Sequence, residues 1–362
     1  MSALPAIAVL AILILVHELG HFMAARIQGI HVNRFSIGFG PVLWKYQGKE
    51  TEYALRAIPL GGYVGFPDDD EESDIPANDP NLMKNRPIID RAIVISAGVI
   101  ANFIFAYLVL LVMTLSVGIG TVDQAGVKIT TILNQNSPAA VAGLQAGDII
   151  LSANGIKFDT GLTTLDRFQT LISKNPNQSV DLVIDRNGRS LQLPILPDGE
   201  SGKGRIGVRL DFTGKPHRRA VHNLAEAFDS ATQSFERLVV MTAQGLKQLV
   251  TNFKNTAGQL SGPVAIVAMG SELVKTDAAA LFDFTAIISI NLAIVNILPL
   301  PALDGGQLVF LAIEALRGGK PLPEDLQNNV MQGGLVILLG LGVVMIFKDS
   351  FNLLQQSGLS PL

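Results

Sequence analysis

Apolar residues gather in four separate runs along the 362-residue chain, at the N-terminus and near positions 93–117, 284–303 and 335–347. A helix needs about 20 predominantly apolar residues to cross the hydrocarbon core of a bilayer. The first three runs reach that length, and the fourth reaches it with flanking residues such as Val330 and Met331. The pattern predicts a polytopic α-helical membrane protein with about four transmembrane helices.

These runs divide the chain into segments of different character. The predicted spans are 1–25, 92–117, 282–310 and 330–347. A polar loop, 26–91, joins the first two, and a soluble insert separates the second from the third. Within the insert, short apolar strands and turns occupy 125–210. Apolar positions at helical spacing predict an amphipathic helix in the segment 220–280, which we expect to lie on the outer membrane surface rather than to form a fifth span.

Two regions have the alternation of β structure. In 32–65, apolar and polar positions alternate on either side of Gly40-Pro41, which predicts a hairpin or a small sheet. In the insert, Asn154-Gly155 and Asn187-Gly188 are dipeptides typical of tight β-hairpin turns.

Composition agrees with a membrane protein and narrows the chemistry. Only 16% of residues are charged and 48% are apolar, whereas a soluble domain carries about 25% charge. The absence of cysteine excludes disulfides and thiolate metal sites. A net charge of −4 gives no indication of nucleic-acid binding. The N-terminal run lacks a basic start and a cleavage site, so we expect it to remain as a span rather than to be removed as a signal peptide.

Positive charges in short loops predict the orientation. Arg26 and Arg91 flank the first loop, and Arg317 and Lys320 lie between the last two spans. Both loops should therefore be cytoplasmic. Both termini and the insert should lie outside.

The first span contains the motif His17-Glu18-Leu19-Gly20-His21. Residues four apart share one face of a helix, so both imidazoles can reach one metal ion, and the adjacent Glu18 can take a proton from metal-bound water. The alternative is two surface histidines with a salt-bridging glutamate. Each ionisable group inside a span costs a few kcal/mol, and a shared cation would compensate for that cost.

Two histidines and a water leave one position of a tetrahedral zinc site for another protein ligand. Among the candidates, His217 and His222 fall outside the membrane in this topology, and His31 lies past the first span. Asp304, at the end of the third span, has a matching depth because the first and third spans run in the same direction. Alternatively, Asp304 only terminates a helix before two glycines.

At this point the chain resembles the site-2 proteases, in the bacterial branch that includes the regulator-of-sigma-E protease. The resemblance covers nearly the whole chain and rests on the first-span motif together with three segments, 58–64, 260–266 and 296–306. Relatives often have proline after the glycine of the second span, where this chain has Gly98-Val99. The resemblance implies one Zn²⁺ per chain, bound by His17, His21 and Asp304, with Glu18 as general base.

The resemblance also implies a substrate class and a location. Substrates would be single-span membrane proteins, such as anti-sigma factors, that another protease has already cut. The enzyme would lie in the bacterial inner membrane, with its active site in the cytoplasmic half of the bilayer. Residues 32–65 would be membrane-associated.

Residues 125–210 look like one bacterial PDZ domain, where many relatives carry two in tandem. Its groove could bind a chain terminus, or the domain could act as a size filter that holds bulky ectodomains away from the site.

Cleavage requires a helical substrate to unwind, and an exposed strand can capture an extended segment. The element 32–65 is the candidate, although it could instead shield the site from lipid. Asn296 could bind the unwound backbone, or it could be a polar cap beside prolines that break the helix. The candidate substrate-binding residues are Trp44, Tyr46, Gly61, Gly62, Asn296, Pro299 and Pro301.

Two other functions compete with intramembrane proteolysis. A PDZ-bearing membrane scaffold could keep zinc for structure alone, but a structural site should close with four protein ligands, and the sequence offers three. A metal transporter would need more polar residues than the second and fourth spans contain.

Overall fold

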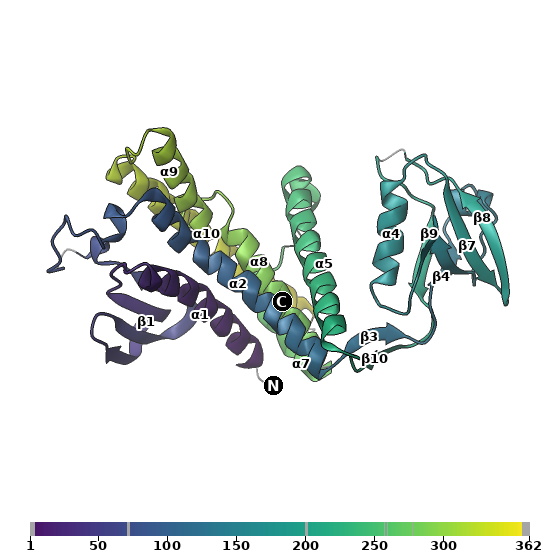
Figure 1. Ribbon diagram of the computed structural model, residues 1–362, viewed down its shortest axis with the longest axis horizontal. Coiled ribbons are helices and arrows are strands. Elements are labelled where there is room, and N and C mark those ends of the chain that lie inside the picture. Colours follow the sequence, from purple (N-terminus) through teal and green to yellow (C-terminus); the bar gives the residue numbers. More distant parts are fainter. Residues whose placement is uncertain are drawn as a thin grey trace. The chain divides into compact units, whose positions relative to one another are not determined.

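The computed structural model describes residues 4–356 apart from 71–72, 200–201, 257, 259 and 277. The chain separates into two compact units, one made of Met1–Met113 with Phe228–Leu362 and the other of Thr114–Ala227. Each unit is described by itself (Figure 1).

Four helices of the first unit are long and apolar enough to cross a membrane: α1 (Leu4–Ile27), α2 (Ile88–Ser116), α8 (Ala278–Asn296) and α10 (Glu324–Gln356). They correspond to the four predicted spans. Two spans differ clearly from the prediction, because α10 extends beyond 330–347 at both ends and α8 stops well before 310.

The early end of α8 corrects the predicted third span. After Asn296 the chain leaves the helix, and a new helix, α9 (Asp304–Leu316), begins at Asp304. Pro299 and Pro301 cannot donate backbone hydrogen bonds and disfavour helical geometry at the residues before them. Ala302 then adopts a positive φ of 66°, which reverses the local path. Asp304 therefore starts a helix rather than ending one.

The segment expected to be a simple connection before the third span contains another helix. This is α7 (Pro263–Thr276), whose Ile266 and Leu273 pack with Val9 and Leu13 of α1 and Phe284 of α8. Its start is held by α10, because the Asp349 carboxylate accepts hydrogen bonds from the backbone N–H groups of Ala265 at 2.9 Å and Gly262 at 3.3 Å. The apolar helix α7 therefore lies in a region that was predicted to be only a connecting segment.

The predicted amphipathic helix is α5 (Leu224–Thr251), followed by the short α6 (Phe253–Thr256). Its Thr232 hydroxyl lies 3.1 Å from that of Tyr107 on α2, and its Phe235 ring contacts the Tyr107 ring. Ten residues further on, Thr242 donates to Asn291 of α8 at 2.7 Å. The helix thus contacts two candidate spans, α2 and α8, and its predicted position on the membrane surface stays a prediction.

The alternating segment forms a small sheet, as expected, from two long bent strands, β1 (Arg34–Gln47) and β2 (Glu52–Gly65). Each strand contributes two segments, and the pairing gives the order 42–47, 52–56, 34–37, 62–65. Residues 42–47 and 62–65 are therefore the two edges. One-turn 3₁₀ helices at Pro67–Asp69 and Met83–Asn85 lie on the way to α2.

The second unit contains a sheet in the order β8-β7-β5-β4-β9, with β6 beside β5. Its buried core includes Ile129, Ile150, Phe168 and Leu182. Both predicted hairpin turns are confirmed, since Asn154 and Asn187 and the glycines after them have positive φ. The elements are β3 (Ile119–Val122), β4 (Val127–Ile132), α3 (Pro138–Val141), β5 (Ile149–Ala153), β6 (Ile156–Lys157), α4 (Thr164–Lys174), β7 (Val180–Arg186), β8 (Arg189–Ile195), β9 (Val208–Phe212) and β10 (Pro216–Arg219).

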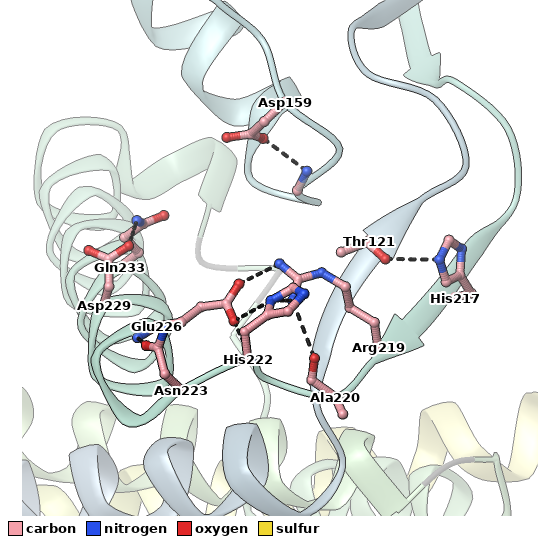
Figure 2. A network of polar contacts seen from close by, with 11 residues as sticks. Thr121, Asp159, His217, Arg219, Ala220, His222, Asn223, Glu226, Asp229 and Gln233 are labelled. Atoms are coloured by element: carbon pink, nitrogen blue, oxygen red, sulfur yellow. Dashed lines mark hydrogen bonds and ion pairs between the residues drawn. The ribbon is translucent and has the colours of Figure 1, made fainter.

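A polar network joins β10 to the first turn of α5 (Figure 2). The Glu226 carboxylate accepts hydrogen bonds from the Arg219 guanidinium at 2.5 Å and from the His222 backbone N–H at 2.7 Å. In return, the Asn223 side chain accepts from the Glu226 N–H at 2.9 Å, which resembles a capping box. The hydrogen bonds from Arg219 and His222 lower the pKa of Glu226 to about 2.

We predict that Glu226→Gln loosens this junction and speeds tryptic cleavage after Arg219 in the full-length protein. The lowered pKa means that the carboxylate stabilises the fold fully above its unfolded pKa of about 4.3 and loses that effect as the pH falls through about 2. At pH 8 the wild type should therefore be protected. Limited trypsin digestion followed by mass spectrometry measures the rate, and Glu236→Gln, on the exposed side of α5, is the control. Equal rates for the two variants would contradict the role of the network.

Candidate metal centre

Helix α1 carries His17 and His21 one turn apart, with Glu18 directly after His17. Helix α9 brings Asp304 against them. The Nε2 atoms of His17 and His21 lie 3.2 Å apart. Oδ2 of Asp304 lies 3.3 Å from the first of these nitrogens and 3.4 Å from the second. Three donor atoms from two helices therefore converge on one point.

This triangle has the dimensions of one face of a tetrahedral zinc site. Zinc binds histidine nitrogen and carboxylate oxygen at about 2.0–2.2 Å, which sets neighbouring ligand atoms about 3.3–3.5 Å apart. Oδ2 of Asp304 is also buried and makes no well-formed hydrogen bond within the described chain. A buried carboxylate oxygen without a donor is costly, and a cation would compensate for it. Among the described residues, this is the one group of three or more His, Cys, Asp or Glu side chains placed to hold a metal.

The position of Asp304 depends on two glycines that follow it. A Cβ atom at Gly305 would lie 2.2 Å from the carbonyl oxygen of Leu298, and one at Gly306 would lie 2.4 Å from that of Leu300. The first turn of α9 therefore packs directly against the non-helical segment before it. At the other end of α9, buried Glu314 forms an ion pair with Arg91 at the start of α2.

Helix α2 also packs closely against the two histidines. A Cβ atom at Gly98 would be 2.3 Å from Nε2 of His21 and 2.8 Å from Cε1 of His17. The backbone carbonyl of Val94 lies 2.8 Å from Nδ1 of His21. Because a carbonyl only accepts, Nδ1 must carry the proton, and Nε2 is left unprotonated to bind a metal.

A cavity of about 1450 Å³ contains His17, Glu18, His21 and Asp304. Elsewhere its wall is mixed, with apolar residues such as Ile95 and Phe310 beside polar and charged ones that can hold water. The polar lining includes Lys84, Arg86, Arg91, Gln307, Glu314 and Asn328. Tyr63 and Val64 of the 62–65 edge line the same cavity, so one edge of the sheet lies beside the candidate metal centre.

The predicted substrate-binding residues fall into two groups. Asn296 lies near the centre, with Nδ2 3.1 Å from Nε2 of His17. Gly62 also lies close, since a Cβ atom there would be 2.7 Å from Cγ of Glu18. Gly61 precedes it with a φ of 143°. Pro299 and Pro301 lie in the break between α8 and α9.

Trp44 and Tyr46 are not among the residues that line the cavity. They belong to the other edge segment, 42–47, where their rings stack on each other at 6.2 Å and are more than half exposed. Their predicted role in substrate binding stays a prediction.

The sequence reading missed the contribution of α2. Val94, Gly98 and Asn102 recur every four residues and so share one helix face, which is turned toward the two histidines. A buried asparagine within an apolar span was the available signal, because such residues are costly unless they have a function.

Four candidate spans, with two histidines of one span facing Asp304 of α9, are the features expected of a membrane-embedded metalloprotein. Comparison with known proteins makes the class specific. The family model of Peptidase family M50 matches residues 5–341, so the chain belongs to that family.

Relatives over the full length agree. The Nostoc sp. protein all3971, whose name assigns it as a zinc metalloprotease, is 58% identical and covers 98% of both chains. The chloroplastic membrane metalloprotease ARASP of Arabidopsis thaliana is 43% identical over 97% of this chain and 79% of its own. Regulator of sigma-E protease RseP of Escherichia coli is 31% identical over 95% of this chain and 97% of its own. The chain is thus a zinc metalloprotease of the site-2 protease type.

Among solved structures, a PDZ domain of an SdrC-like protein from Listeria monocytogenes is 24% identical and aligns with a TM-score of 0.22. The match covers 25% of this chain and 90% of that domain.

We predict that Gly98→Ala weakens zinc binding by more than about tenfold, because the added methyl group would displace the imidazole of His21. Zinc competition with a chromophoric chelator, on protein purified in detergent, measures the affinity. Gly340→Ala is the matched control, since a Cβ atom there meets nothing within 4 Å. An unchanged affinity in Gly98→Ala would show that α2 does not confine the histidines.

Proposed function

We propose that this protease cleaves the membrane-spanning segments of single-span membrane proteins at a zinc held by His17, His21 and Asp304. The observation that carries the proposal is the spacing of the three ligand atoms, 3.2 to 3.4 Å, at a cavity that also contains Glu18. The name of the E. coli relative, regulator of sigma-E protease, makes anti-sigma factors a candidate substrate class. Prior cleavage by another protease would shorten such substrates to a size that fits the site.

The residues have separate tasks. Bound zinc would supply Lewis acidity, polarising the scissile carbonyl and lowering the pKa of a water. Glu18 takes a proton from the attacking water and passes it to the leaving amine. Asn296, whose amide lies 3.1 Å from Nε2 of His17, donates a hydrogen bond to the unwound substrate backbone. Pro299 and Pro301 hold the neighbouring backbone out of helical geometry.

The edge segment 62–65 receives the extended substrate as an added strand. Asn33 donates its N–H to the carbonyl of Gly65 at 3.1 Å, so the backbone groups of Gly65 point into the sheet. Alternation along the strand then directs the N–H and carbonyl of Val64 outward. An outward-facing edge of this kind offers hydrogen bonds to an extended peptide.

The orientation follows from the loops. Arg26, Arg91, Arg317 and Lys320 favour a cytoplasmic position for the loops that contain them. The charged part of the cavity wall, with Lys84, Arg86 and Arg91, would then face the cytoplasm and admit water. Both termini and the 125–210 domain would lie outside, in a bacterial inner membrane. We propose that this domain is a PDZ domain that limits access of bulky ectodomains.

We predict that Glu18→Gln retains zinc but lowers the rate of substrate cleavage by about 10²–10⁴-fold, since the amide cannot accept the proton. Cleavage of a single-span reporter in detergent, together with metal analysis of the same sample, checks both parts. Asp304→Ala provides the contrast, because it should lose zinc as well as activity. Cleavage at the wild-type rate by Glu18→Gln would refute its assignment as the base.

We predict that Val64→Pro reduces kcat/KM for a membrane substrate about tenfold or more while zinc affinity stays within about twofold. Proline removes the outward N–H, yet it is tolerated at a sheet edge. Val64→Ala is the control, because it removes more of the side chain but keeps the N–H. If the alanine variant is as impaired as the proline variant, the loss comes from side-chain packing and strand addition at this edge is excluded.

A further inference from the structure

The two candidate histidine ligands each present a second ring nitrogen to α2. His21 meets the backbone carbonyl of Val94 through Nδ1 at 2.8 Å. His17 meets the side-chain amide of Asn102, whose Nδ2 lies 3.3 Å from Nδ1 of the imidazole. Both rings therefore direct Nε2 toward Asp304 and Nδ1 toward α2.

Asn102 is held firmly where it makes this contact. The residue is fully buried, and its backbone carbonyl accepts a hydrogen bond at 2.8 Å from the hydroxyl of Ser289, which is itself fully buried on α8. Oδ1 of Asn102 is buried without a partner in the described chain. A polar side chain in such surroundings is costly, which calls for a functional reason.

Metal chemistry determines the direction of the hydrogen bond between Asn102 and His17. An imidazole that binds zinc through Nε2 carries its proton on Nδ1, so it needs an acceptor there. A half-turn of the Asn102 amide exchanges Nδ2 and Oδ1, which have nearly the same shape. The carbonyl oxygen can then accept a hydrogen bond from the Nδ1–H of His17, as the carbonyl of Val94 does for His21.

We propose that Asn102 is a positioning residue that sets the tautomer and ring orientation of His17 by accepting a hydrogen bond from its Nδ1. Together with the Val94 carbonyl it forms an outer set of acceptors, because positions 94 and 102 are eight residues apart and so lie on one face of α2. Gly98 lies between them and leaves room for both rings. This inference rests on the metal site of the proposed function.

The test measures zinc affinity in the full-length protein, purified in detergent and titrated against a competing chelator. Asn102→Leu keeps the approximate volume but removes the acceptor, and it should weaken zinc binding 10- to 100-fold. Asn102→Asp keeps an acceptor, whether ionised or protonated, and should bind zinc within threefold of the wild type or more tightly. Asn291→Leu is the control, because this asparagine of α8 bonds Thr242 rather than a histidine.

The outcomes separate this inference from the proposed site. If His17→Ala binds zinc like the wild type, the site itself is wrong. If His17→Ala loses zinc while Asn102→Leu retains wild-type affinity, the site stands and the role of Asn102 is overturned. A loss of more than threefold in Asn102→Asp overturns it too, since a donor rather than an acceptor would then be required. Should Asn102→Leu fail to fold, Asn102→Ala, which also removes the acceptor, takes its place and should weaken zinc binding in the same way.

Discussion

The Asp304 carboxylate faces two histidines of an apolar helix, and much of the structure around it serves to make that position tolerable. An isolated charge within a bilayer costs several kcal/mol. Two imidazole nitrogens within 3.4 Å of Oδ2 create a site where a dication offsets the carboxylate and uses all three donor atoms. Holding the three donor atoms together requires the helices that carry or surround them to pack closely. Gly20 lets α1 approach α2, since a Cβ atom there would be 2.4 Å from the carbonyl oxygen of Ala97.

Irregular backbone occurs in this bundle beside the cavity. Between α8 and α9, Leu300 donates to Leu298 at 2.7 Å and Leu303 donates to Leu300 at 3.3 Å, so the turn satisfies part of its own hydrogen bonding. Strand edge 62–65 meets the same cavity. Backbone of this kind is tolerated at membrane depth only where it is buried in protein or lines a wet cavity. A substrate helix that unwinds here would meet backbone partners and water in place of lipid.

Local patterns were sufficient to predict the four apolar helices and the two hairpin turns, and to group His17, Glu18 and His21 on one helix. The choice of Asp304 as the third ligand candidate also followed from the sequence, and its Oδ2 lies 3.3 and 3.4 Å from the two imidazole nitrogens. Its local structure did not: the prolines indicated a break, but the restart at Asp304 depends on Gly305 and Gly306 packing under the preceding carbonyls. Alternation in 32–65 could not identify the inner edge, since the pairing of 34–37 with 62–65 is a long-range choice. For this reason Trp44 and Tyr46 were grouped with Gly61 and Gly62, although they lie on opposite edges.

The candidate centre also makes metal binding and folding interdependent. Its parts come from separate helices: two ligands from α1, one from α9, ring partners from α2, and the Ser289 anchor from α8. No single helix holds the ligand geometry by itself, so the unfolded chain has no comparable site. A ligand that binds only the folded state stabilises it by mass action, and zinc sites commonly contribute in this way. Removing zinc should therefore loosen the contacts among these four helices as well as abolish catalysis, which joins the stability of the bundle to the chemistry that it encloses.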